Sequence, residues 1–179
     1  WSSDVCSSDL ISQVLKPTAK GMVAEKRPFQ GILYAGLIQT ATGPKVIEFN
    51  ARFGDPETQV VLARLESPLS EIISSLLVKE QPTIAWNELA SVGVVVAAEG
   101  YPNQYKTNLP LPEMSGETIY YAGVTRSEQA LVSAGGRIFL AEATASTLEE
   151  ARKKVYQTLD NYSFPGMYYR KDIGVKGLI

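Results

Sequence analysis

Two oxygen-bearing side chains, Glu48 and Asn50, stand two residues apart in the otherwise apolar segment Val-Ile-Glu-Phe-Asn. Side chains alternate between the two faces of a β-strand, so in a strand this pair would share one face, opposite Ile47 and Phe49. Carboxylate and amide oxygens are hard ligands that suit Mg²⁺ or Mn²⁺, and Mg²⁺ keeps positions for water and substrate phosphates. The pair therefore predicts a divalent-metal site that also holds phosphate groups.

The surroundings of the pair allow two interpretations. In a buried strand, an unpartnered carboxylate and amide would cost several kcal/mol of desolvation, and a divalent cation would offset that cost. On a solvated strand face, Glu48 and Asn50 need no ligand at all. The spacing of the two residues leaves both interpretations open.

Charged residues follow at the expected end of this strand. Asp55 and Pro56 have the order of a helix N-cap and a first helical residue, and the apolar spacing extends this helix to about residue 66. Free backbone N–H groups at such a helix start, together with Arg52, would bind a phosphate or a carboxylate. The alternative is a capped turn in which Arg52 pairs with Asp55 or Glu57.

Composition restricts both the chemistry and the partners. The 179 residues include no histidine and a single cysteine, Cys6, which excludes imidazole catalysis, histidine-dependent nucleophiles, histidine-ligated zinc and a disulfide framework. A formal net charge of −2 and the lack of a basic stripe argue against a nucleic-acid partner. No apolar run of about 18 residues and no signal-peptide pattern is found, so we expect a cytoplasmic protein without a membrane partner.

The opening segment, WSSDVCSSDL at residues 1–10, has an unusual composition. It lacks an initiator Met, fits no helical or strand period, and resembles one reading frame of a sequencing-library adapter. We interpret it as a non-native segment, the alternative being a natural polar N-terminal arm.

Apolar spacing and turn signals predict the elements around the metal site. Residues 11–25 show a helical stripe in which Pro17 marks a kink or a break. The apolar run 31–40 predicts a buried strand, and the turn signal Thr-Gly-Pro at 42–44 leads into the strand that carries Glu48. These two strands are expected to form a hairpin.

A second group of elements follows. A helix is predicted at 67–79, and the change to a valine-rich pattern places a domain boundary near residue 85. Beyond it we expect an α+β unit on a mostly antiparallel sheet. Thr147 and Glu150 form a capping box at the start of its main helix. The strands of this unit are predicted at 91–102, 117–124 and 137–145, and 167–174 is expected to form a last strand or a turn.

The run PKVIEFNARFGDPETQVVLARL (44–65), preceded by GILYAGL (31–37), resembles the strand-turn-helix of ATP-grasp ligases, in the wording of the glycinamide ribonucleotide synthetase family. The resemblance implies a fold class, the C-terminal part of an ATP-grasp domain at 11–85 followed by a small, mostly antiparallel α+β domain at 86–179. It continues over PTAKGM (17–22), ASVGVVVAAEGYP (90–102), GGRIFLAEATA (135–145) and RKDIG (170–174).

The resemblance also implies an activity. Members of this family join glycine to 5-phosphoribosylamine at the expense of ATP, through a glycyl phosphate intermediate, in de novo purine synthesis. Glu48 and Asn50 match the metal-ligand positions of the motif, where Mg²⁺ or Mn²⁺ bridges phosphate oxygens. Arg52 would hold phosphate or acyl phosphate as a nucleotide-binding and catalytic residue. Asp55, as a second catalytic residue, would with Glu57 orient Arg52 or the incoming amine.

The chain departs from the family pattern in one respect. Upstream of Glu48 we find no glycine-rich loop, no strand lysine and no adenine-binding hinge segment. We therefore expect the missing N-terminal half of the same enzyme as a partner, and a fragment that is inactive alone. Two alternatives remain: another ATP-grasp member, such as a different carboxylate-amine ligase or a biotin-dependent carboxylase, or a non-catalytic interaction module with a ligase-like fold.

Overall fold

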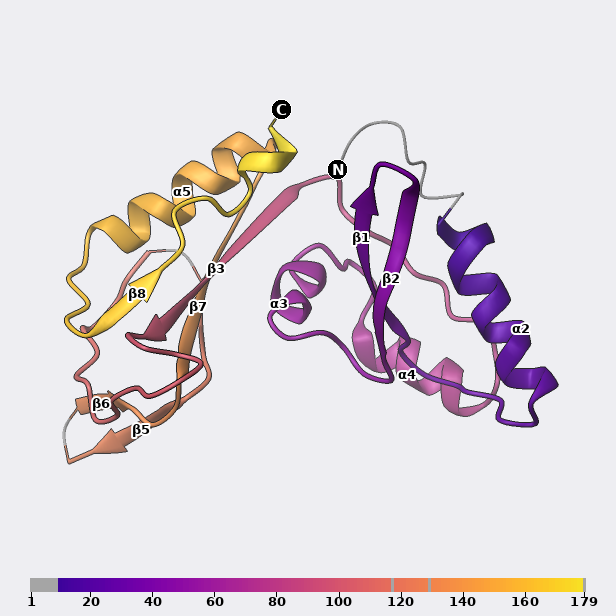
Figure 1. The fold of residues 1–179 in the computed structure, drawn as a ribbon, viewed down its shortest axis with the longest axis horizontal. Helices are drawn as coiled ribbons and strands as arrows, with labels where there is room; N and C mark the ends of the chain where they lie inside the picture. The colour runs from indigo at the N-terminus through magenta and orange to yellow at the C-terminus, as the bar shows by residue number, and fades with distance from the viewer. Residues whose placement is uncertain (1–9, 117, 129, 179) are drawn as a thin grey trace. The chain divides into compact units, whose positions relative to one another are not determined.

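The computed structural model describes residues 10–116, 118–128 and 130–178 (Figure 1). Of the opening segment that we interpret as non-native, these residues include only Leu10, so that prediction lies almost entirely outside the described part of the chain.

The chain forms two compact units. The first unit extends to Asp55 and resumes over Glu66–Ala85, whereas the second contains Pro56–Leu65 and the chain from Trp86 onward. The chain thus passes into the second unit, returns, and leaves the first unit for good at Ala85. The division into two family domains near residue 85 stays a prediction.

The first unit begins with a helix whose hydrogen-bonding pattern changes at Pro17. Ile11–Leu15 forms a π-helical turn (η1), and Lys16–Ala24 continues as an α-helix (α2). Pro17 lies in the first turn of α2 and has no N–H to donate to a carbonyl of η1. The helix predicted over 11–25 is present, and its hydrogen-bonding pattern changes next to Pro17 without a break in the helix.

A hairpin follows, as the turn signal predicts. β1 (Tyr34–Thr40) and β2 (Gly43–Asn50) are antiparallel neighbours. In the connecting turn, the Thr42 N–H donates to Thr40 Oγ1 over 3.2 Å. Gly43 has a φ of 97°, a conformation that glycine adopts without steric cost.

The hairpin is exposed, which contradicts our expectation of a buried strand at 31–40. Ile38 on β1 is 51% exposed, and Ile47 and Phe49 on β2 are 65% and 42% exposed. β1 and β2 form a two-stranded sheet of their own. A sheet face becomes a core only when a second layer covers it, and within the described part of the chain these side chains remain open to solvent.

The remaining helix of the first unit is α4 (Leu69–Leu77), which begins after Pro68 and buries Ile72. It is two residues shorter at each end than the predicted helix over 67–79. Ser67 Oγ accepts a hydrogen bond from the Ala85 N–H over 2.8 Å, so the start of this helical segment is tied to the point where the chain leaves the first unit.

The second unit is built on a four-stranded antiparallel sheet with the order β4-β7-β3-β8, which confirms the predicted antiparallel architecture. A separate hairpin pairs β5 with β6. The strands are β3 (Ala90–Ala98), β4 (Thr118–Tyr121), β5 (Val124–Ser127), β6 (Ala130–Ser133), β7 (Arg137–Ala145) and β8 (Met167–Tyr169).

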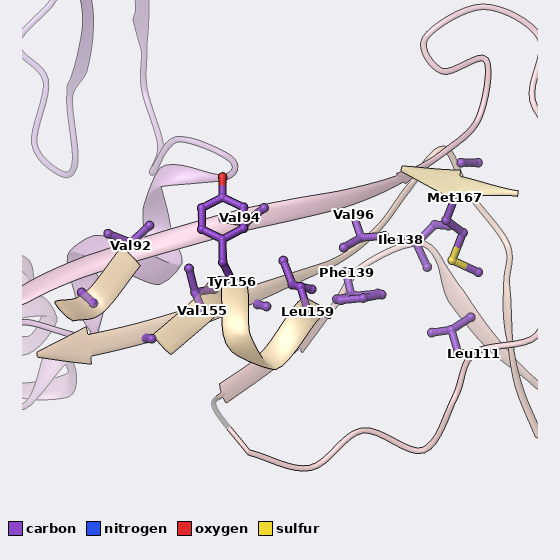
Figure 2. Close-up of a cluster of buried hydrophobic side chains, with 14 of the residues drawn as sticks. Val92, Val94, Val96, Leu111, Ile138, Phe139, Val155, Tyr156, Leu159 and Met167 are labelled. Atoms are coloured by element: carbon purple, nitrogen blue, oxygen red, sulfur yellow. The ribbon is translucent and has the colours of Figure 1, made fainter. Parts of the chain in front are cut away.

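One face of this sheet is covered by α5 (Leu148–Asp160). Figure 2 shows Val94 from β3 and Val155 and Leu159 from α5 in one cluster, and all three are completely buried. Burying each such side chain contributes about 1.5–3 kcal/mol. Thr147 caps the helix by accepting a hydrogen bond from the Glu150 N–H, as predicted. Among the described residues, no helix has the length and apolar character needed to cross a membrane.

The short helix α3 (Glu57–Leu62) belongs to the second unit and lies against β3. An added Cβ on Gly93 would come within 2.7 Å of Val60 Cγ1, so the two elements touch where the strand has no side chain. The helix ends at Leu62, before the predicted end near residue 66. The reason is tertiary, because Leu65 forms a β-bridge with Trp86.

The C-terminal segment, which ends in the 3₁₀ turn η2 (Val175–Gly177), is held against α5 by Arg152 and Tyr156. Arg152 Nη2 donates to the Lys171 carbonyl over 2.7 Å, and the Tyr156 hydroxyl donates to the Arg170 carbonyl over 2.7 Å. Burial raises the pKa of the Tyr156 hydroxyl. The RKDIG motif therefore has a clear structural contribution in the second unit.

Candidate functional site

The predicted metal-binding pair lies at the end of β2 (Figure 1). Asn50 Nδ2 donates a hydrogen bond to Glu48 Oε1 over 2.9 Å. The two side chains therefore share one face of the strand, as its alternating pattern predicts. Glu48 is exposed and Asn50 is half-buried, so an ion can reach both from solvent.

The exposure of the pair removes one argument for a metal. A carboxylate that is open to water carries little desolvation cost, so that cost cannot be the reason for a bound cation. What favours an ion is the donor set, a carboxylate beside an amide. A rotation of the Asn50 side-chain amide would turn its oxygen toward an ion held by Glu48.

The donor count indicates which ligands would complete such a site. Among the described residues, no group of three or more histidine, cysteine, aspartate or glutamate side chains is placed to hold a metal. The chain thus offers Glu48 and Asn50, and the other positions would fall to water or substrate phosphates. Mg²⁺ is commonly bound in this way, through one or two carboxylates plus phosphate oxygens.

The opposite strand brings two residues to the pair that the sequence pattern did not single out. In the register of the hairpin, Gly36 pairs with Glu48 and Tyr34 pairs with Asn50. Counting residues back from the turn would place these pairs one residue out of register, because a β-bulge shifts the pairing between Gly36 and Leu37.

The charged residues after β2 are arranged differently from the prediction. Asp55 is not a helix N-cap, since α3 begins at Glu57 and its N-cap is Pro56, which offers no side-chain oxygen. The prediction of an N-cap at Asp55 was wrong, because local residue order cannot show where tertiary contacts let a short helix begin and end. Whether the start of this helix and Arg52 bind an anion stays a prediction.

The side chain of Arg52 is accessible to a ligand from solvent. It is exposed, and its Nη1 donates to the neighbouring Phe53 carbonyl over 2.7 Å. That contact is local and uses one of the five N–H donors of the guanidinium. Whether Arg52 pairs with Asp55 or Glu57 stays a prediction.

Comparison with known families gives two matches. The family model described as Phosphoribosylglycinamide synthetase, ATP-grasp (A) domain, matches residues 1–58. The model described as Phosphoribosylglycinamide synthetase, C domain, matches residues 91–176. The chain belongs to the phosphoribosylglycinamide synthetase family. The A-domain match contains Glu48, Asn50 and Arg52, and its first residues include the segment that we interpreted as non-native, an interpretation that stays a prediction.

Relatives within the phosphoribosylglycinamide synthetase family are named phosphoribosylamine-glycine ligase. The protein from Halalkalibacterium halodurans is 49% identical over 180 residues, which cover 98% of this chain and 42% of the relative. The protein from Lactococcus lactis is 48% identical, with 96% and 42% covered. The crystal structure of the Thermotoga maritima ligase superposes with a TM-score of 0.81 at 31% identity, covering 94% of this chain and 44% of that chain.

These matches confirm the predicted fold class, the C-terminal part of an ATP-grasp domain followed by a small, mostly antiparallel α+β domain. The chain spans less than half the length of the curated phosphoribosylglycinamide synthetase relatives that it matches.

Proposed function

We propose that this chain is part of an ATP-dependent ligase that joins glycine to 5-phosphoribosylamine. The observation that carries the proposal is the hydrogen-bonded Glu48–Asn50 pair, which lies inside the match to the family's ATP-grasp domain. The names of the relatives supply the substrates. The proposal includes a cytoplasmic location and excludes a nucleic-acid or membrane partner.

The reaction balances in two steps. The γ-phosphoryl group of ATP is transferred to the glycine carboxylate, which gives ADP and glycyl phosphate. The amine of 5-phosphoribosylamine then attacks the acyl carbon and forms the new C–N bond. The acyl C–O bond to phosphate breaks, inorganic phosphate leaves, and the nitrogen loses one proton. A bound Mg²⁺ or Mn²⁺ would neutralise charge on the phosphate oxygens.

The residues of this chain contribute binding and orientation. Glu48 and Asn50 would hold the ion at the end of β2, and Arg52 would donate hydrogen bonds to a phosphate or to the acyl phosphate. Asp55 would orient Arg52 or accept a hydrogen bond from the incoming amine. The roles of Glu48 and Asn50 follow from their place at the end of β2. The roles of Arg52 and Asp55 follow from their charge and their position in the loop after β2.

The rest of the nucleotide site would come from the family's upstream sequence. The relatives are more than twice as long as the matched region, and this chain contains no glycine-rich loop before Glu48. We therefore propose that these 179 residues alone neither bind ATP tightly nor catalyse the ligation. The missing N-terminal half of the enzyme would be the obligatory partner.

The test joins the chain from Ile11 to the upstream part of the Halalkalibacterium halodurans relative. The joined protein is expected to form ADP only when glycine and 5-phosphoribosylamine are both present. Glu48→Gln should reduce the rate at least about 100-fold, since charge stabilisation by a metal contributes several kcal/mol. Glu71→Gln, on the exposed side of α4, is the matched control and should leave the rate unchanged.

Three outcomes would contradict the proposal. ADP formation with a different carboxylate or amine would indicate another ATP-grasp ligase. A joined protein that folds but forms no ADP would favour a non-catalytic module. Full activity of Glu48→Gln would remove the proposed metal ligand.

A further inference from the structure

We propose that Gly36 is a positioning residue, which keeps open the space that the Glu48 carboxylate needs to stand beside Asn50. The inference rests on the proposed metal-binding function of Glu48. It concerns a residue on the opposite strand, within the run GILYAGL (31–37), to which the spacing of charged residues did not point.

The register of the hairpin is the first observation. Counting from the turn, Ile38 pairs with Lys45 and Leu37 pairs with Val46, so a regular ladder would place Ile47 opposite Gly36. The bulge skips Ile47 and brings Glu48 opposite Gly36 instead. A single shift in register thus places the only glycine of β1 directly across from the predicted metal ligand.

The second observation is the space itself. A Cβ atom added to Gly36 would lie 3.1 Å from Glu48 Cγ and 3.8 Å from Tyr34 Cε1. Carbon atoms in contact are ordinarily about 3.5–4.0 Å apart. A methyl group at residue 36 would therefore be too close to Glu48 Cγ, and the Glu48 side chain would have to shift by a few tenths of an ångström or adopt another rotamer.

The φ of Gly36 does not require glycine. Among the described residues six glycines have a positive φ, and Gly36 is not one of them. Glycine within a strand also weakens the strand by about 0.5–1 kcal/mol relative to alanine. Gly36 thus carries a stability cost, and the space beside Glu48 is the structural feature that depends on it.

The predicted consequence separates binding from stability. Glu48 is exposed, so its side chain can rotate into solvent when residue 36 gains a side chain. The hydrogen bond from Asn50 would then be lost, and the two oxygens would no longer face one ion. The strand would keep its ladder and gain β propensity.

The experiment uses the joined protein with MnCl₂ as the probe. Gly36→Ala should raise the Mn²⁺ concentration for half-maximal activity about 10-fold, because loss of a residue that orients a metal ligand typically weakens metal binding about 10- to 100-fold. Gly36→Val, with a larger side chain, should raise that concentration further. The melting temperature should stay equal or rise. Gly21→Ala in α2, where an added Cβ meets nothing within 4 Å, is the matched control and should leave the Mn²⁺ dependence unchanged.

Two measurements make the inference falsifiable independently of the proposed function. If Glu48→Gln does not alter the Mn²⁺ dependence, the proposed function fails. If Glu48→Gln alters it but Gly36→Val does not, the positioning inference fails. A crystal structure of metal-free Gly36→Ala with the Asn50–Glu48 hydrogen bond intact would overturn the inference whatever the metal response.

Discussion

Val94 in β3 has no exposed surface, whereas Ile47 in β2 is 65% exposed, although both are apolar residues in the middle of a strand. The difference lies in what covers each sheet. α5 packs on the sheet that contains β3, and the β1–β2 hairpin is a sheet of two strands only. An apolar residue in the middle of a strand therefore became part of a core in the second unit and part of an open surface in the first.

The same contrast separates the residues that stabilise the fold from the residues that we propose bind the metal ion. The second unit contains the large buried cluster of β3, β7 and α5. The first unit carries Glu48 and Asn50, whose hydrogen bond lies at the surface. We infer that substitutions in the second unit change mainly the free energy of unfolding, and substitutions beside Glu48 change mainly metal binding.

The largest expected effect on stability tests the buried side of this comparison. Leu159→Ala on α5 should reduce the free energy of unfolding by about 2–5 kcal/mol, because it leaves a cavity in a fully buried cluster. Ile47→Ala on β2 is the matched control and should cost less than about 1 kcal/mol, since little buried surface is lost. Urea denaturation of both variants gives the comparison, and equal losses would contradict it.

An intermediate effect is expected from two glycines in strands, Gly93 in β3 and Gly36 in β1. Gly93→Ala would place a methyl group 2.7 Å from Val60 Cγ1 and 3.1 Å from Leu140 Cδ1. Both neighbours lie in a packed interface, so the variant should lose about 1–3 kcal/mol through overpacking. Gly36→Ala, whose neighbour Glu48 can move into solvent, should lose nothing. Thermal denaturation of the two variants shows which added methyl group destabilises the fold. We expect a lower melting temperature for Gly93→Ala and an unchanged or higher one for Gly36→Ala.

The smallest expected effect depends on pH. Lys171 Nζ lies 2.6 Å from Asp160 Oδ1, and the Tyr169 hydroxyl donates to the same oxygen over 2.7 Å. The hydrogen bond from Lys171, followed by the one from Tyr169, lowers the pKa of the Asp160 carboxyl below its ordinary value. A lowered pKa in the folded state stabilises the protein above about pH 4, and this contribution is lost as the pH falls through the folded pKa.

Both partners are exposed, so the contribution of the pair is below about 1 kcal/mol. Asp160→Asn should therefore lower the free energy of unfolding slightly at about pH 6 to 7, which is about two to three units above the ordinary pKa. The difference from the unmodified protein should shrink toward pH 3, about one unit below that value, and also at high salt. A difference that stays constant with pH would show that the carboxylate is not stabilised by Lys171.

Several features of the fold follow from neighbouring residues alone. The period of two along β2 is enough to place Glu48 and Asn50 on one face, because side-chain direction in a strand is a local property. The hairpin turn at Ala41 and Thr42 and the Thr147 cap are equally local, since each depends on residues at most three positions apart. These predictions were confirmed for that reason.

Other features needed contacts between segments far apart in the chain. The end of α3 at Leu62 depends on the bridge from Leu65 to Trp86, and the packing of Val60 depends on Gly93. The incorrect prediction of an N-cap at Asp55 belongs here as well. A short helix has too little intrinsic stability to define its own limits, so tertiary contacts set them.

The amino-acid sequence alone determined the family likeness, the strand faces and the oxygen pair at Glu48 and Asn50, because these depend on residue types and on a short repeat along one strand. Only the tertiary structure decided that the hairpin is exposed and that a bulge sets Gly36 opposite Glu48. Burial and cross-strand register arise from the pairing and layering of segments, and a single strand does not contain that information.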